Sequence, residues 1–185
     1  MVTEEPGSTP HHPGCNQMAI REVLLLGNLQ LYEVSETVLR EELDDIRNIV
    51  TDIHDTLLDF RKRHGAGRAI AAPQIGKMKR LLYMHIDEPV VFINPILDMM
   101  SKEMIDVWDD CLCFPDLWVK VKRHKSCRIS YKDAWWKNKE MWLDGDLSEL
   151  LQHEFDHLDG ILAVSRAIDG QSFALKNQRG HLSLG

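Results

Sequence analysis

The chain has 185 residues, of which 44% are hydrophobic and 28% are charged, and its formal net charge is -7. This length and apolar content suffice for one globular domain with a substantial core, and the negative charge without a basic block argues against nucleic acid as a direct partner. No apolar run is long enough to span a membrane, so no membrane partner is expected.

The N-terminal residues are rich in proline, glycine, threonine and glutamate, and they lack the apolar core of a secretion signal. We predict a disordered N-terminal tail over residues 1–18, a single domain over 19–170 and a C-terminal tail over 171–185. Cysteines in a chain without a secretion signal indicate a reducing compartment, which favours the cytoplasm and leaves an organelle open. The chain contains Cys15, Cys111, Cys113 and Cys127.

A long amphipathic helix is predicted over residues 35–64, with Gly65 as its C-cap. Spacings of three and four alternate along one apolar stripe, which is typical of a helix that packs on a core. A coiled coil is the alternative, but the stripe ends after about four heptads. The stripe consists of Leu39, Leu43, Ile46, Val50, Ile53, Leu57 and Phe60.

The next segment, 65–76, contains three glycines and a proline among small residues, which indicates turns rather than regular structure. A phosphate loop is the alternative, but its Gly-Lys-Ser/Thr ending is absent. Short apolar runs and alternating residues then predict strands over 81–86, 90–94, 119–122 and 127–131. Three tryptophans beside a polar hairpin are expected to pack over the sheet, with an exposed contact patch as the alternative: Trp135, Trp136 and Trp142.

The run Gln152–Gly160 contains the sequence His-Glu-x-x-His. Helix residues four apart share a face, so His153 and His157 point the same way and offer two ligands for a tetrahedral metal site. Glu154 lies beside them, where a carboxylate can accept a proton from a water that a metal activates. A helix with two surface histidines is the alternative, but the apolar stripe around the motif indicates a buried helix whose histidines need partners.

We expect this helix to start at Asp146 as N-cap, with Glu149 completing a capping-box-like pair, and to stop at Gly160. One long helix, then several strands, then the metal-binding helix is an order typical of the α+β class. The predicted fold is therefore a long N-terminal helix and antiparallel β-sheets packed around a central helix that carries His-Glu-x-x-His.

A catalytic zinc-type site takes three protein ligands and leaves a fourth position open. Asp169 and His181 are downstream candidates for the third ligand, and a thiolate of Cys111 is the upstream candidate. Cys113 could be a further ligand, but two thiolates and two histidines would close the site to water. The residues alone leave these choices open.

Three separated segments share a pattern with one known family. They are Ala-Ala-Pro-Gln-Ile-Gly at 71–76, Cys-Leu at 111–112 and the motif helix at 152–160, with Ile-Asn-Pro at 93–95 as a further match. In this order they resemble the peptide deformylases, over roughly residues 25–162. The resemblance implies a hydrolase that removes the N-formyl group from the N-terminal methionine of new polypeptides and releases formate.

The resemblance also implies one bound divalent ion, Fe²⁺ first, with Zn²⁺, Ni²⁺ or Co²⁺ possible because Cys-His-His sites accept several metals. Its ligands would be Cys111, His153 and His157. Glu154 would be the general base and acid, and Gln74 and the backbone N–H of Leu112 would hold the oxyanion. Formylated nascent peptides are the implied partner, met near the ribosome. The implied substrate-binding residues are Gly67, Ala69, Ile70 and Asp110.

Several residues depart from the family pattern. Ala69 and Asp110 replace glycines, Cys113 replaces a serine, and Asp109 replaces a glutamate that could brace the site by pairing with Arg123. Asp146 and Glu149 are acidic where the family has apolar residues against the methionine side chain. These departures favour an alternative, a related amide hydrolase that acts on a different N-acyl amino acid or peptide. An inactive metal-binding module and a general metallopeptidase are the remaining alternatives.

Overall fold

The structure is a computed structural model that describes residues 19–182. Two α-helices are present in this part of the chain, α1 (Leu43–His64) and α2 (Asp146–Leu158). Every strand pairing is antiparallel, in a five-stranded sheet of order β1-β2-β3-β6-β7 and a three-stranded sheet of order β4-β5-β8. The strands are β1 (Ala69–Ala71), β2 (Leu81–His85), β3 (Pro89–Asp98), β4 (Met104–Asp110), β5 (Leu117–His124), β6 (Ser126–Lys132), β7 (Asn138–Asp144) and β8 (Phe173–Leu175).

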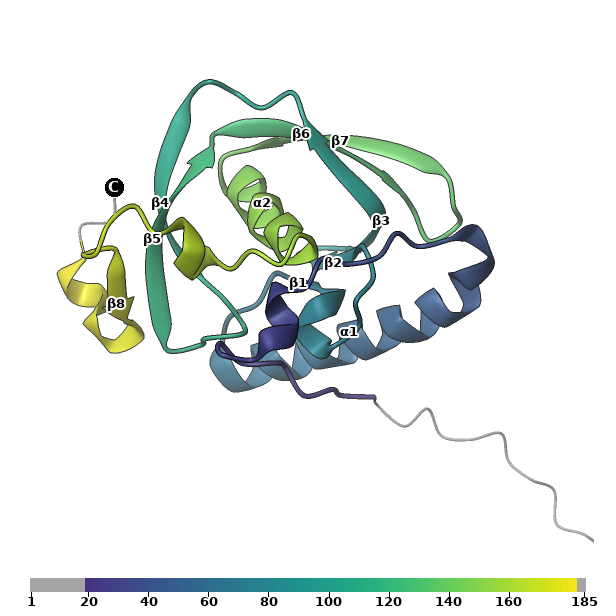
Figure 1. Ribbon diagram of the computed structural model, residues 1–185, viewed down its shortest axis with the longest axis horizontal. Coiled ribbons are helices and arrows are strands. Elements are labelled where there is room, and N and C mark those ends of the chain that lie inside the picture. The colour runs from purple at the N-terminus through teal and green to yellow at the C-terminus, as the bar shows by residue number, and fades with distance from the viewer. Residues whose placement is uncertain (1–18, 183–185) are drawn as a thin grey trace, which may run out of the picture.

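The five-stranded sheet lies between the two helices, and side-chain alternation along β1 and β2 decides which helix each residue meets. Ile70, Leu81 and Tyr83 face α1, whereas Ala69 and Leu82 face α2. Figure 1 shows α2 in the middle of the molecule, enclosed by both sheets, with α1 along the outside. The α+β prediction, including antiparallel sheets around a central helix with the motif, is confirmed.

The prediction that α1 begins near Ser35 is wrong. The chain there is extended, because Glu36 bridges to Lys79 and the side chain of Asn94 bonds both the N–H and the C=O of Val38. A short 3₁₀ turn, η2 (Arg40–Glu42), leads into the helix at Leu43. The predicted C-cap is confirmed, since Gly65 adopts the left-handed conformation at φ 67° and its N–H bonds the carbonyl of Arg61.

The glycine-rich segment is more regular than its composition suggests. Residues 69–71 form β1 and residues 72–75 form a 3₁₀ turn, η3 (Ala72–Ile75), so the prediction of turns alone is wrong.

The packing of the tryptophans also differs from expectation. Trp135 and Trp142 are 76% and 62% exposed, and only Trp136 packs against the α1 core.

The start of α2 differs from the predicted capping box. Gly145, at φ 51°, occupies the N-cap position, and no side chain caps the helix. Glu149 instead bonds Arg68, a residue 81 positions away, which tertiary contact alone could provide. The predicted stop is confirmed at Gly160, whose φ is 68° and where a Cβ would lie 2.4 Å from the carbonyl oxygen of Tyr32.

The predicted tail 1–18 lies outside the described residues, and the predicted domain boundaries stay a prediction. Within the predicted C-terminal tail, Phe173–Leu175 pairs with β5 as β8, and a 3₁₀ segment, η5 (Lys176–His181), follows it. No helix in residues 19–182 is both long and apolar enough to cross a membrane.

Candidate active site and metal centre

The two motif histidines and a distant cysteine meet at a buried point in the interior of the molecule. His153, His157 and Cys111 are only 5%, 1% and 5% exposed. The Nε2 atoms of the histidines are 3.3 Å apart, and the Sγ of Cys111 lies 3.3 Å from Nε2 of His157. The structure therefore places these three predicted ligands within 4.8 Å of one another.

These distances suit ligands that share one ion. Two nitrogens on a tetrahedral zinc-type ion lie about 3.3 Å apart, and a nitrogen and a thiolate sulfur roughly 3.6 Å. Burial raises the pKa of the Cys111 thiol, so its thiolate would gain from a nearby cation. Burial lowers the pKa of His157, which keeps its imidazole neutral and able to coordinate a metal. The donor set thus fits a divalent ion.

The other ligand candidates have different roles or places. Asp169 accepts hydrogen bonds from the N–H of Gln171 and the hydroxyl of Ser172. His181 belongs to η5 and is not part of the cluster. Cys113 is buried beside the site, but its Sγ accepts a hydrogen bond from Nε2 of Gln74 at 3.5 Å, and it is not one of the three grouped ligands.

A buried charge network braces the ligand helix. Oδ1 of Asp109 lies 2.9 Å from Nδ1 of His153, a close contact that is not aligned as a hydrogen bond. Arg123 joins Asp109, at 2.7 Å, to Asp156, which also binds Arg166. Burial acts to raise the pKa of Asp109, but His153 and Arg123 outweigh it and hold the value at about 2. The predicted pairing of Asp109 with Arg123 is confirmed.

Glu154 is the buried carboxyl next to the ligands. It is 2% exposed, and its Oε2 has no hydrogen-bond partner among the described residues. Burial, the largest influence, raises the pKa of Glu154 to about 7. A carboxyl with a pKa near neutrality can both accept and donate a proton at working pH.

Gln74 is fixed so that its amide nitrogen points at the centre. Its Oε1 accepts a hydrogen bond from the N–H of Ala71 at 2.7 Å, which orients the amide. Its Nε2 is left to face the sulfurs of Cys111 and Cys113, both at 3.5 Å. Gln74 is fully buried within η3, so β1 and η3 together place this donor.

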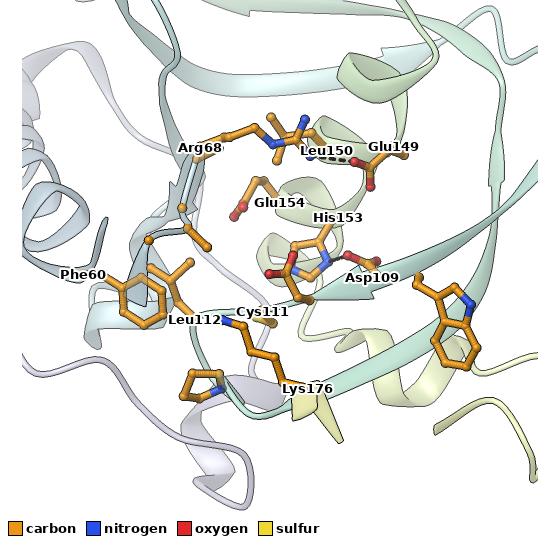
Figure 2. Close-up of a pocket in the computed structure, with 17 residues that line it drawn as sticks. Phe60, Arg68, Asp109, Cys111, Leu112, Glu149, Leu150, His153, Glu154 and Lys176 are labelled. Atoms are coloured by element: carbon orange, nitrogen blue, oxygen red, sulfur yellow. Dashed lines mark hydrogen bonds and ion pairs between the residues drawn. The ribbon is translucent and has the colours of Figure 1, made fainter. Parts of the chain in front are cut away.

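A cavity of about 310 Å³ opens onto this centre, and Figure 2 shows Glu154 and His153 on its inner wall. Leu112 and three of the four expected substrate-binding residues, Gly67, Ala69 and Asp110, line it. The side chain of Ile70, the fourth, instead faces α1 in the core.

Sequence reasoning missed other residues that line the cavity. Lys176 reaches it because β8 pairs with β5 and carries the following residues to the rim. Arg68 crosses one wall and bonds Glu149 at 2.7 Å. An arginine within a segment of small residues was a local signal for Arg68, whereas the sequence holds no such signal for Lys176. The further missed residues are Phe60, Gly65, Ala66, Trp108, Pro115 and Leu150.

A family model described as polypeptide deformylase matches residues 20–172. The chain belongs to this family. Among curated relatives, a peptide deformylase of Erythrobacter litoralis is 32% identical, over 80% of this chain and 89% of its own. Peptide deformylase 1 of Prochlorococcus marinus is 33% identical, over 87% of this chain and 88% of its own.

Solved structures agree with the family. A peptide deformylase from Synechococcus elongatus in complex with actinonin has a TM-score of 0.76 at 26% identity and covers 92% of this chain and 90% of its own. One from Acinetobacter baumannii with Met-Ala-Ser bound has a TM-score of 0.74 at 27% identity, over 81% of this chain and 99% of its own. Family membership makes the chain a metal-dependent hydrolase that removes the N-formyl group from nascent peptides.

Proposed function

We propose that the chain removes the formyl group from N-terminal methionine with Fe²⁺ held by Cys111, His153 and His157. The observation that carries this proposal is the juxtaposition of three buried ligand atoms with the buried carboxyl of Glu154 at the inner end of a cavity. Methionine as the first residue is supported by the Met-Ala-Ser found in the Acinetobacter baumannii relative.

A peptide can enter the cavity as an extended chain between two sheet edges. β1 ends the five-stranded sheet and β4 ends the three-stranded sheet, and residues of both strands line the cavity. Edge strands present unpaired N–H and C=O groups that pair readily with an added strand. Ala69 of β1 and Asp110 of β4 would flank such a peptide, which suits a substrate recognised through its backbone.

Two donors would then meet the formyl oxygen. Nε2 of Gln74 is held in the centre by the bond between its Oε1 and Ala71, and the backbone N–H of Leu112 follows Cys111 directly at the cavity wall. Donors fixed before the reaction stabilise a developing oxyanion by about 3 kcal/mol each. Neither donor has to reorganise as the negative charge forms.

Glu154 would move the proton. As carboxylate it accepts a proton from the attacking water, and as carboxylic acid it returns that proton to the nitrogen of the departing amine. The C–N bond of the formamide breaks, and formate and a free N-terminus result. A bound divalent ion supplies Lewis acidity for the carbonyl oxygen and makes water more acidic.

The ligand types determine which ions the site can hold. Thiolate and imidazole ligands suit Fe²⁺, Zn²⁺, Ni²⁺ and Co²⁺, and Fe²⁺ is the ion we propose.

The substrate indicates where the reaction takes place. Formylated chains arise at ribosomes, so we place the reaction near the ribosome, in the cytoplasm or an organelle that makes such chains.

The decisive experiment measures formate release from formyl-Met-Ala-Ser by protein loaded with Fe²⁺ under anaerobic conditions, beside Glu154→Ala. Rapid release that the substitution abolishes, with metal content unchanged, is the expected result. Absence of release by protein that holds one equivalent of metal would contradict the proposal. Loading with Zn²⁺ in parallel tests the choice of ion.

A further inference from the structure

One wall of the cavity is an ion pair. Nη2 of Arg68 lies 2.7 Å from Oε1 of Glu149, and both residues line the cavity. Figure 2 shows the side chain of Arg68 running across the cavity from its wall near β1 to Glu149 on α2. The pair is partly covered by protein, since the Arg68 and Glu149 side chains are 44% and 15% exposed.

The pair lies beside the reacting groups. Glu149 precedes His153 by four residues on α2, so the two share a helix face, and Glu154 follows directly. Leu150 also lines the cavity. A peptide added alongside β1 would point alternate side chains toward α2, as Ala69 and Ala71 of β1 do. The side chain next to the formamide would therefore meet Glu149, Arg68 and Leu150.

An ion pair and an apolar surface treat an entering side chain differently. The thioether of a methionine side chain that covers Arg68 and Glu149 displaces their remaining water and forms no hydrogen bond in its place. A carboxamide of the same length can donate to the carboxylate of Glu149 and accept from the guanidinium of Arg68. Because Leu150 is apolar, the aliphatic stem of either side chain finds a partner there.

We propose that the Arg68–Glu149 pair sets the side-chain selectivity of this site, so that formyl-peptides with a hydrogen-bonding first residue, such as glutamine, are accepted about as well as those with methionine. This inference rests on the proposed deformylation and extends its substrates beyond peptides that begin with formyl-methionine.

The test compares formyl-Gln-Ala-Ser with formyl-Met-Ala-Ser, because the two first side chains have similar length and differ in polarity. The ratio of kcat/KM values is measured for the wild-type protein and for Arg68→Met with Glu149→Leu. A matched control replaces the α1 pair Arg63 and Asp59 by Met and Leu, since that pair has the same 2.7 Å separation, similar exposures of 54% and 24%, and no place in the cavity. Glu149→Gln, which keeps the shape, serves if the double variant does not fold.

The expected result is a wild-type Met:Gln ratio within about fivefold of one, and a rise of tenfold or more in the double variant, as a change of pocket polarity gives. Glu149→Gln should raise the ratio in the same direction, and the control should leave it unchanged. A wild-type preference for methionine above about fivefold, or a ratio that the cavity variants do not move, would overturn the inference.

Binding separates this inference from the proposed reaction. Calorimetry with Glu154→Ala protein and the same two peptides measures affinity without turnover. Comparable affinities support the inference even if no formate is released by the wild-type protein, which would contradict the proposed function alone. A strong preference for the formyl-Met peptide in binding would overturn the inference even if deformylation is rapid.

Discussion

The buried centre and the cavity wall differ in how firmly their charges are held. Around His153, the partners Asp109, Arg123 and Asp156 are all less than 10% exposed and joined in one network. On the wall, Arg68 is 44% exposed and, in the described residues, has one ion-pair partner, Glu149. The buried centre is therefore surrounded by charges with several partners each, whereas the cavity wall carries a single, partly exposed ion pair.

The largest effect should follow removal of a ligand. We expect Cys111→Ser to lose nearly all turnover and to weaken metal binding more than the roughly 10- to 100-fold typical of residues that only support a ligand. Metal content after dialysis, measured by atomic emission, checks this expectation. Normal metal content in the variant would disprove the assignment of Cys111 as a ligand.

The next effect concerns the proton carrier. Glu154→Ala should lower kcat by about 10²- to 10⁴-fold, the range for loss of a general acid–base. Its metal content should stay near one equivalent, because Glu154 is not among the three clustered ligand residues. Formate release and metal analysis on the same sample test both statements, and a loss of metal together with activity would assign Glu154 a structural role.

Stability should distinguish the two regions. Arg123→Met leaves the carboxylates of Asp109 and Asp156 buried without this partner, so the free energy of unfolding should fall by about 3–5 kcal/mol. Urea denaturation measures the change. Arg128→Met is the control, because Arg128 pairs with Asp98 at the surface and its loss should matter much less. Equal losses in both variants would contradict the distinction.

The smallest stability change is expected at the wall. Glu149→Gln should alter the free energy of unfolding by less than about 1 kcal/mol, since one partner of the pair is exposed. The same variant should still shift the Met:Gln ratio. Denaturation and kinetics on one preparation test this separation, and a large loss of stability would make Glu149 a structural residue of α2.

Local patterns were enough for the features that depend on near neighbours. The spacing of His153 and His157 placed both rings on one face, and the conformational freedom of Gly65 and Gly160 marked the helix ends. The stripe of α1 predicted the helix but not its start, because residues 35–39 are extended through bonds to Asn94 and Lys79, which are distant in the sequence.

The chain's own sequence thus determined the α+β class, the motif helix and, through resemblance, the reaction. Only the tertiary structure brought Cys111 to within 3.3 Å of His157 across 46 positions, and Arg68 to Glu149 across 81. Helical and strand periodicity act over a few residues, whereas these contacts depend on how two sheets enclose one helix. The polar wall of the cavity is therefore a property of the fold that no local pattern contains.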